Sequence, residues 1–124
     1  MKAYISGLGL GALLLLGSTL AYGQKHQVNV GDDGQVVTQH QHMHAKAGHT
    51  INWRRATGGS KPWFVKFADS PCAEGSEFGS DRAKTCTIKV ACKAAGDAGC
   101  KAYAYQSATG PNATLNDPDI IIDP

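Results

Sequence analysis

Short stretches in which apolar and polar residues alternate recur along residues 24–124, and turn residues separate them. Residues 63–67 are a clear example, because Trp63, Val65 and Phe67 would share one face of a strand. The same pattern predicts seven strands in total, at residues 27–30, 35–44, 50–54, 63–67, 86–90, 101–106 and 120–122.

These strands and the segments between them predict the fold class. No segment carries a sustained helical stripe, and the polar residues 68–84 show no convincing period, so we expect a loop there with at most a helical turn. Residues 57–61 are rich in glycine and predict a second loop. About seven short strands in roughly a hundred residues indicate one all-β domain, an antiparallel or mixed β-sandwich.

The N-terminal residues have the pattern of a secretory signal. Lys2 supplies a positive charge, residues 5–16 are apolar and uncharged, and Ala21 and Gly23 are the small residues of a cleavage site. We therefore expect residues 1–23 to be a signal peptide and residues 24–124 to be exported, either to the periplasm or out of the cell.

An uncleaved membrane anchor is the alternative for this segment. Residues 3–22 are nearly long enough to span a bilayer. Four glycines weaken this stretch as a helix, and the cleavage signal lies at its end. The sequence thus favours a protein with no stable membrane anchor after cleavage.

Charge and cysteine content narrow the possible partners. The formal net charge is +2, and no basic cluster extends beyond Arg54 and Arg55, so we do not expect nucleic-acid binding.

Four cysteines in an exported domain predict disulfides. A four-cysteine metal site is the alternative, although no Cys-x-x-Cys pair is present. Of the three possible pairings, the sequence favours Cys72 with Cys86 and Cys92 with Cys100, the latter closing a short loop.

Four segments, taken in order, are similar to those of a known family. Residues 47–53 are a small-residue-Gly turn followed by a strand that ends in tryptophan, and residues 63–67 are the next strand. Residues 99–105 carry a Gly-x-x-x-Tyr-x-Tyr pattern, and residues 117–122 form a closing strand. This order resembles the cupredoxin-like family, which includes plastocyanin and azurin. The resemblance implies a Greek-key β-sandwich.

The chain departs from that family at the copper ligands. A type 1 copper site uses two histidines, a cysteine thiolate and a weak axial ligand. The family's cysteine position, two residues after the Tyr-x-Tyr pair, is Ser107 here. No histidine follows His49, and no methionine follows Met43. Without the thiolate, the chain is expected to lack a type 1 copper centre.

A histidine-rich segment is the main candidate for chemistry. Residues 39–44 alternate, so a strand would place His40, His42 and His44 on one face and Met43 on the other. Same-face neighbours lie about 7 Å apart, which lets two adjacent imidazoles meet one ion at nitrogen–metal bonds of about 2 Å.

A third ligand would come from elsewhere, and His26 and His49 are candidates. The candidate metal ligands are His40, His42, His44 and His49, and imidazole ligands suit copper or zinc. Two alternatives remain open: adventitious weak metal binding, and a solvated polar face on an edge strand with no ligand.

Two functions follow from these observations. The first is an exported, non-enzymatic binding protein that holds copper or zinc on its histidine segment. The second is a metal-free interaction module that presents the loops at residues 57–61 and 68–84 to a protein or carbohydrate partner. A small redox or hydrolytic enzyme is a third class, but the chain has no Gly-x-Ser-x-Gly motif and no assignable catalytic residue.

Overall fold

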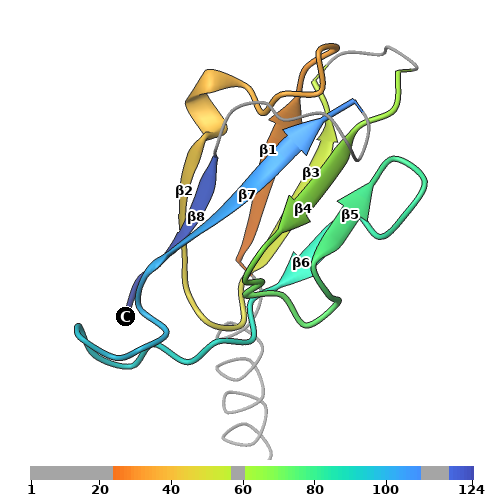
Figure 1. The fold of residues 1–124 in the computed structure, drawn as a ribbon. Helices are drawn as coiled ribbons and strands as arrows, with labels where there is room; N and C mark the ends of the chain where they lie inside the picture. Colours follow the sequence, from red (N-terminus) through yellow and green to blue (C-terminus); the bar gives the residue numbers. More distant parts are fainter. Residues whose placement is uncertain (1–23, 57–60, 110–117) are drawn as a thin grey trace, which may run out of the picture.

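Two facing β-sheets make up the protein in the computed structural model (Figure 1), which describes residues 24–56, 61–109 and 118–124. Both sheets are mixed, so the architecture is an all-β sandwich, as the strand pattern predicted. The predicted signal peptide, residues 1–23, and most of the glycine-rich loop, residues 57–60, lie outside the described residues. No helix among the described residues is long and apolar enough to cross a membrane.

The smaller sheet has the order β1-β3-β6. Its strands are β1 (Lys25–Val30), β3 (Thr50–Arg55) and β6 (Thr85–Thr87). β1 runs parallel to β3, and β6 runs antiparallel to β3. The parallel pair aligns Val28 with Trp53, so both side chains lie on the buried face of this sheet.

The larger sheet has the order β2-β8-β7-β4-β5. Its strands are β2 (His42–Ala45), β8 (Asp119–Ile122), β7 (Ala102–Ala108), β4 (Phe64–Phe67) and β5 (Glu77–Gly79). β2 runs parallel to β8, and the remaining neighbours are antiparallel. In the described part of the chain, β2 is therefore an edge strand with a strand neighbour on one side only (Figure 1).

Aromatic residues from both sheets form the centre of the core. Trp53 of β3 is fully buried and lies 4.9 Å from the ring of Phe78 on β5. Its indole N–H donates to the buried Tyr105 hydroxyl on β7 at 3.3 Å. The apolar positions of the alternating strands meet between the sheets and exclude water, which is the main stabilising contribution in such a sandwich.

The predicted strand at residues 35–44 is wrong over most of its length. Residues Thr38–His40 form a 3₁₀ turn, and only His42–Ala45 are a strand. The chain leaves the edge of the smaller sheet, where Val36 bridges to Val30, and crosses to the edge of the larger one. Residues 38–41 are polar, so no buried face fixes them as an extended strand during this crossing.

The segment at residues 68–84, expected to be a loop, contains the short strand β5. Its central residue, Phe78, is fully buried against Trp53 and Phe67, whereas Glu77 is exposed. A three-residue strand gives too short an alternation to be recognised in a polar segment.

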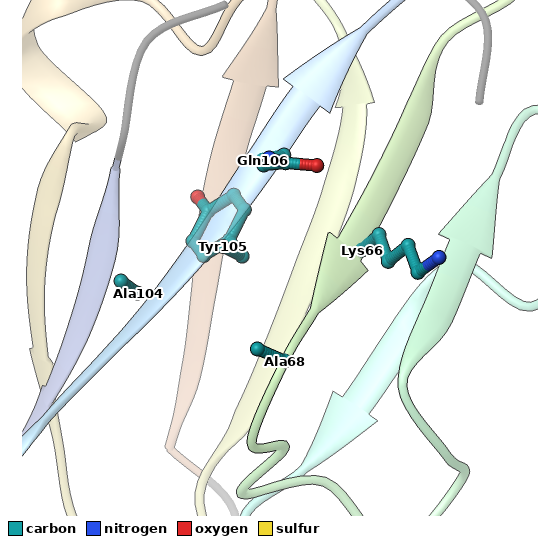
Figure 2. Close-up of a pocket in the computed structure, with 5 residues that line it drawn as sticks. All are labelled: Lys66, Ala68, Ala104, Tyr105 and Gln106. Atoms are coloured by element: carbon teal, nitrogen blue, oxygen red, sulfur yellow. The ribbon is translucent and has the colours of Figure 1, made fainter. Parts of the chain in front are cut away.

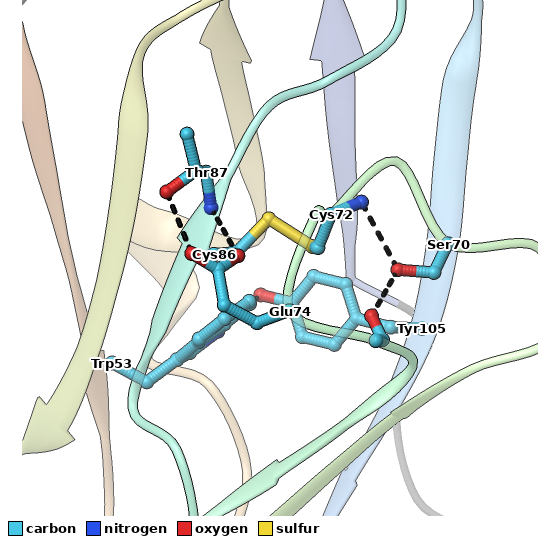
Figure 3. The surroundings of a disulfide bond; sticks show 8 residues. Trp53, Ser70, Cys72, Glu74, Cys86, Thr87 and Tyr105 are labelled. Atoms are coloured by element: carbon cyan, nitrogen blue, oxygen red, sulfur yellow. Dashed lines mark hydrogen bonds between the residues drawn. A yellow bond between two sulfur atoms is a disulfide. The ribbon is translucent and has the colours of Figure 1, made fainter.

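Both predicted disulfides are present, which confirms the favoured pairing. Cys72 is bonded to Cys86, and Cys92 to Cys100. The first disulfide lies in the core near Trp53 and Tyr105 (Figure 3). Beside it, the Glu74 carboxylate accepts hydrogen bonds from the backbone N–H and the hydroxyl of Thr87 (Figure 3). Two disulfides indicate folding in an oxidising environment.

Candidate functional site

Two exposed histidines of the edge strand β2 are each hydrogen-bonded to an aspartate, one at the start of β8 and one just after its end. His42 Nδ1 lies 2.9 Å from Asp119 Oδ1, and His44 Nδ1 lies 2.8 Å from Asp123 Oδ2. The imidazole side chains are 66% and 61% exposed. These four residues, His42, His44, Asp119 and Asp123, are called the edge histidine site below.

The hydrogen bonds to the aspartates determine which ring nitrogens are available. An ionised carboxylate only accepts hydrogen bonds, so Nδ1 of each histidine carries the proton that it donates. In a neutral imidazole the other nitrogen, Nε2, then has a free lone pair. Both histidines of the edge histidine site can therefore present Nε2 as a ligand.

The local sequence explains why the two imidazoles share a face. His42 and His44 alternate along β2 with the half-buried Met43 and the buried Ala45, which point toward the core. The register places Asp119 directly opposite His42, and Asp123 follows the end of β8 on the same side. The expectation that Met43 points away from the histidines is confirmed.

His40 lies apart from this pair. It ends the 3₁₀ turn, and its Nδ1 accepts a hydrogen bond from the backbone N–H of Asn29 at 2.9 Å. The prediction that His40 shares a strand face with His42 and His44 is wrong, because the chain turns at residues 38–40 instead of remaining extended.

The other two histidines meet each other at the start of β1 and β3. His26 Nε2 lies 3.0 Å from His49 Nδ1, and the backbone N–H of Lys46 donates to that same Nδ1 at 3.2 Å. The Nδ1 lone pair of His49 thus accepts hydrogen bonds from both His26 and the Lys46 backbone, and His26 carries its proton on Nε2. Burial, and secondarily the neighbouring His49, lower the pKa of His26.

The structure therefore separates the predicted metal ligands into three places. His42 and His44 form one pair, His40 stands alone, and His49 pairs with His26. Within the described residues, no three histidine, cysteine, aspartate or glutamate side chains are grouped so that they could hold one metal ion. Any ion at the edge histidine site would take its remaining ligands from outside the described part of this chain.

The positions at which the resemblance would place copper ligands have packing roles. Ser107 is fully buried, and its hydroxyl accepts a hydrogen bond from the backbone N–H of Val36 at 3.0 Å. Trp63, which begins the segment where the family has its first histidine, is 4% exposed. All four cysteines are in disulfides, and the described residues contain no free thiol. A thiolate ligand for a type 1 centre is therefore missing.

A shallow hollow between β4 and β7 is a further candidate for binding. Its volume is about 250 Å³, and Figure 2 shows the five residues that line it: Lys66, Ala68, Ala104, Tyr105 and Gln106. Only Lys66 and Gln106 offer exposed polar groups, and the Tyr105 hydroxyl already accepts the Trp53 N–H. The hollow has no set of converging polar groups that would orient a ligand.

Sequence reasoning missed the two aspartates of the edge histidine site. They lie 77 and 79 residues from their histidine partners along the chain. One signal was present: Asp119, Ile121 and Asp123 alternate with Ile120 and Ile122, so a strand there has an acidic outer face.

No protein-family model, curated protein or solved structure matches this chain.

Proposed function

We propose that this protein is an exported, non-enzymatic metal-binding protein that holds copper or zinc through Nε2 of His42 and His44. The observation that carries the proposal is the pair of hydrogen bonds from Nδ1 of these histidines to Asp119 and Asp123. Histidines that bind metals almost always donate their other ring N–H to such an acceptor, which fixes the ring and raises the basicity of the ligating nitrogen.

The chemistry of the donors indicates the class of ion. Neutral imidazoles suit Cu(II) and Zn(II), whose bonds to nitrogen are about 2 Å long. Same-face neighbours on a strand are separated by about 7 Å, a spacing from which two imidazoles can meet one ion. Because exposed ion pairs stabilise a fold by only about 0–1 kcal/mol, we do not expect stability to be the main role of the two His–Asp pairs.

The fold family and location belong to the same proposal. The segments that resemble cupredoxins contribute β3 to one sheet and β4, β7 and β8 to adjoining positions in the other, which supports a cupredoxin-like sandwich without a type 1 copper site. Two disulfides and the predicted signal peptide support a periplasmic or secreted location.

Calorimetric titration with Cu(II) and Zn(II) tests the metal site. The untagged protein is expressed from the full sequence in a host that exports it. We expect binding tighter than about 1 μM, which corresponds to about 8 kcal/mol, and its loss in the H42A/H44A variant. The matched control is H40N, which changes a histidine outside the site and keeps an acceptor for the Asn29 N–H. Binding that survives in H42A/H44A, or disappears in H40N, would contradict the proposal.

A metal-free interaction module is the second candidate. The observation in its favour is a polar concavity of about 520 Å³ lined by residues 31–33, 35–39 and 41, at the end of the sandwich where η1 (Thr38–His40) lies. Concave surfaces formed by loops commonly bind partners. Such a module would bind no metal tightly, and the H42A/H44A variant would bind its protein or carbohydrate partner as the parent protein does.

A further inference from the structure

The edge histidine site supplies only two ligands to an ion. Zn(II) in structural sites is almost always bound by four ligands in a tetrahedral arrangement. The described residues of one chain form no group of three or more histidine, cysteine, aspartate or glutamate side chains that could hold one metal ion, and the carboxylates of Asp119 and Asp123 bind Nδ1 of the two rings instead of the ligating Nε2. Two ligand positions of a bound zinc would therefore be left for water or for another molecule.

A second copy of the chain can supply the two missing ligands. In a twofold dimer the same surface of each subunit meets its counterpart, so a pair of histidines on one copy faces the same pair on the other. Two copies of the edge histidine site together offer four imidazole Nε2 atoms, which completes a tetrahedral zinc site.

The position of the site permits such an approach. Among the described residues β2 is an edge strand of the larger sheet, and His42 and His44 are mostly exposed there. On the same outer face the exposed residues of the nearby strand β7 include the small Ala102 and Ala104, which do not obstruct a neighbour. Asp119 and Asp123 contribute two negative charges per copy, which repel across the interface until a dication is bound.

We propose that zinc joins two copies of this protein through His42 and His44 of each copy. The inference rests on the proposed function, because it uses the same two ligating nitrogens, and it adds a second copy of this chain as the partner. The hydrogen bonds from Asp119 and Asp123 hold the four imidazoles in orientations that the ion can use.

Sedimentation velocity combined with calorimetric stoichiometry tests the dimer. Without zinc we expect a monomer. With zinc at half the chain concentration, the mass should double, with one ion bound per two chains, and chelation should restore the monomer. Excess zinc should also restore the monomer, because each chain then holds an ion of its own. A bridging ion predicts this rise and fall, whereas dimerisation by general charge neutralisation predicts only a rise.

Two variants separate the possible failures. H42A/H44A should remain monomeric at every zinc concentration, and H40N should dimerise as the parent protein does. Tight zinc binding with no doubling of the mass at zinc equal to half the chain concentration would overturn the dimer but leave the proposed function intact. No binding at all would overturn both. Dimerisation that persists in H42A/H44A, or that occurs without zinc, would also overturn the inference. Circular dichroism spectra of each variant would establish that it is folded.

Discussion

At the scale of single residues, the chemistry of the edge histidine site depends on which nitrogen of each imidazole carries the proton. A histidine free in solvent exchanges between its two neutral forms and rotates freely. In His42 and His44, Asp119 and Asp123 accept the proton on Nδ1, which favours one of these neutral forms and one orientation of each ring. The carboxylates thus reduce the side-chain conformational entropy that is lost when a metal ion binds, and they leave Nε2 of each ring as the ligand.

Replacement of both aspartates tests this role. In D119N/D123N the neutral amide oxygens are weaker acceptors of the Nδ1 protons than the carboxylates, so we expect the affinity for zinc to fall by about 10- to 100-fold, the usual cost of mutating the partners behind metal-bound histidines. Calorimetry measures the change, and D69N serves as a control because Asp69 pairs with Lys101 instead of a histidine. An affinity unchanged in D119N/D123N would mean that the aspartates do not assist binding.

At the scale of secondary-structure elements, the contact between His26 and His49 links the start of β1 to the turn before β3. Both imidazole rings are half-buried there, and His49 also accepts a hydrogen bond from the backbone N–H of Lys46. Protonation of His26 is disfavoured there, first by burial and then by the nearby His49. The pairing of β1 with β3 should therefore depend on pH.

The direction of this pH dependence follows from the lowered pKa of His26. A histidine of the unfolded chain titrates near 6.5, so over the range below that value the unfolded state binds more protons than the folded state. The contribution of His26 to stability is complete above about pH 6.5 and is lost as the pH falls toward the lower folded pKa.

We expect the free energy of unfolding of the parent protein to decline more between about pH 7.5 and about pH 5 than that of H26N, in which an amide N–H can still reach His49. Urea denaturation at each pH measures both proteins. Parallel declines would contradict a specific role for His26.

At the scale of the whole molecule, the disulfide between Cys72 and Cys86 connects the loop after β4 to the smaller sheet. Cys86 belongs to β6, and Cys72 forms an isolated bridge with Ile88 just beyond that strand. This disulfide therefore joins the connection between β4 and β5, two strands of the larger sheet, to the smaller sheet. A domain of about a hundred residues has a modest core, so such a covalent link is a large part of its stability.

Removal of this disulfide should lower the free energy of unfolding substantially. The bonded cysteines are 14 residues apart, and closing a loop of about that length stabilises a protein by about 3 kcal/mol. We expect C72A/C86A to lose at least that much. C92A/C100A should lose less, because its loop spans 8 residues and Cys100 is only partly buried. Denaturant midpoints compare the two variants, and the reverse order would contradict this ranking.

Local sequence patterns predicted much of the architecture. Alternation of apolar residues identified β3, β4, β7 and β8, because burial of one face of a strand leaves a period of two in the sequence. Residues 31–34, Gly-Asp-Asp-Gly, are typical of a turn. In the structure Gly34 has a φ of +79°, and a side chain there would collide with the backbone of Ala108. Cysteine spacing led to the correct disulfides.

The candidate site could be predicted only in part. The sequence by itself placed His42 and His44 on one face of a strand, because side chains two residues apart along a strand point to the same side. Their exposure was seen only in the tertiary structure. Only the tertiary structure decided that His40 and His49 lie elsewhere and that Asp119 and Asp123 hold the remaining pair. The physical reason is that a periodic pattern reports which face of a strand is buried. The order and register of strands decide which distant side chains meet, and these arise from the packing of the whole sandwich.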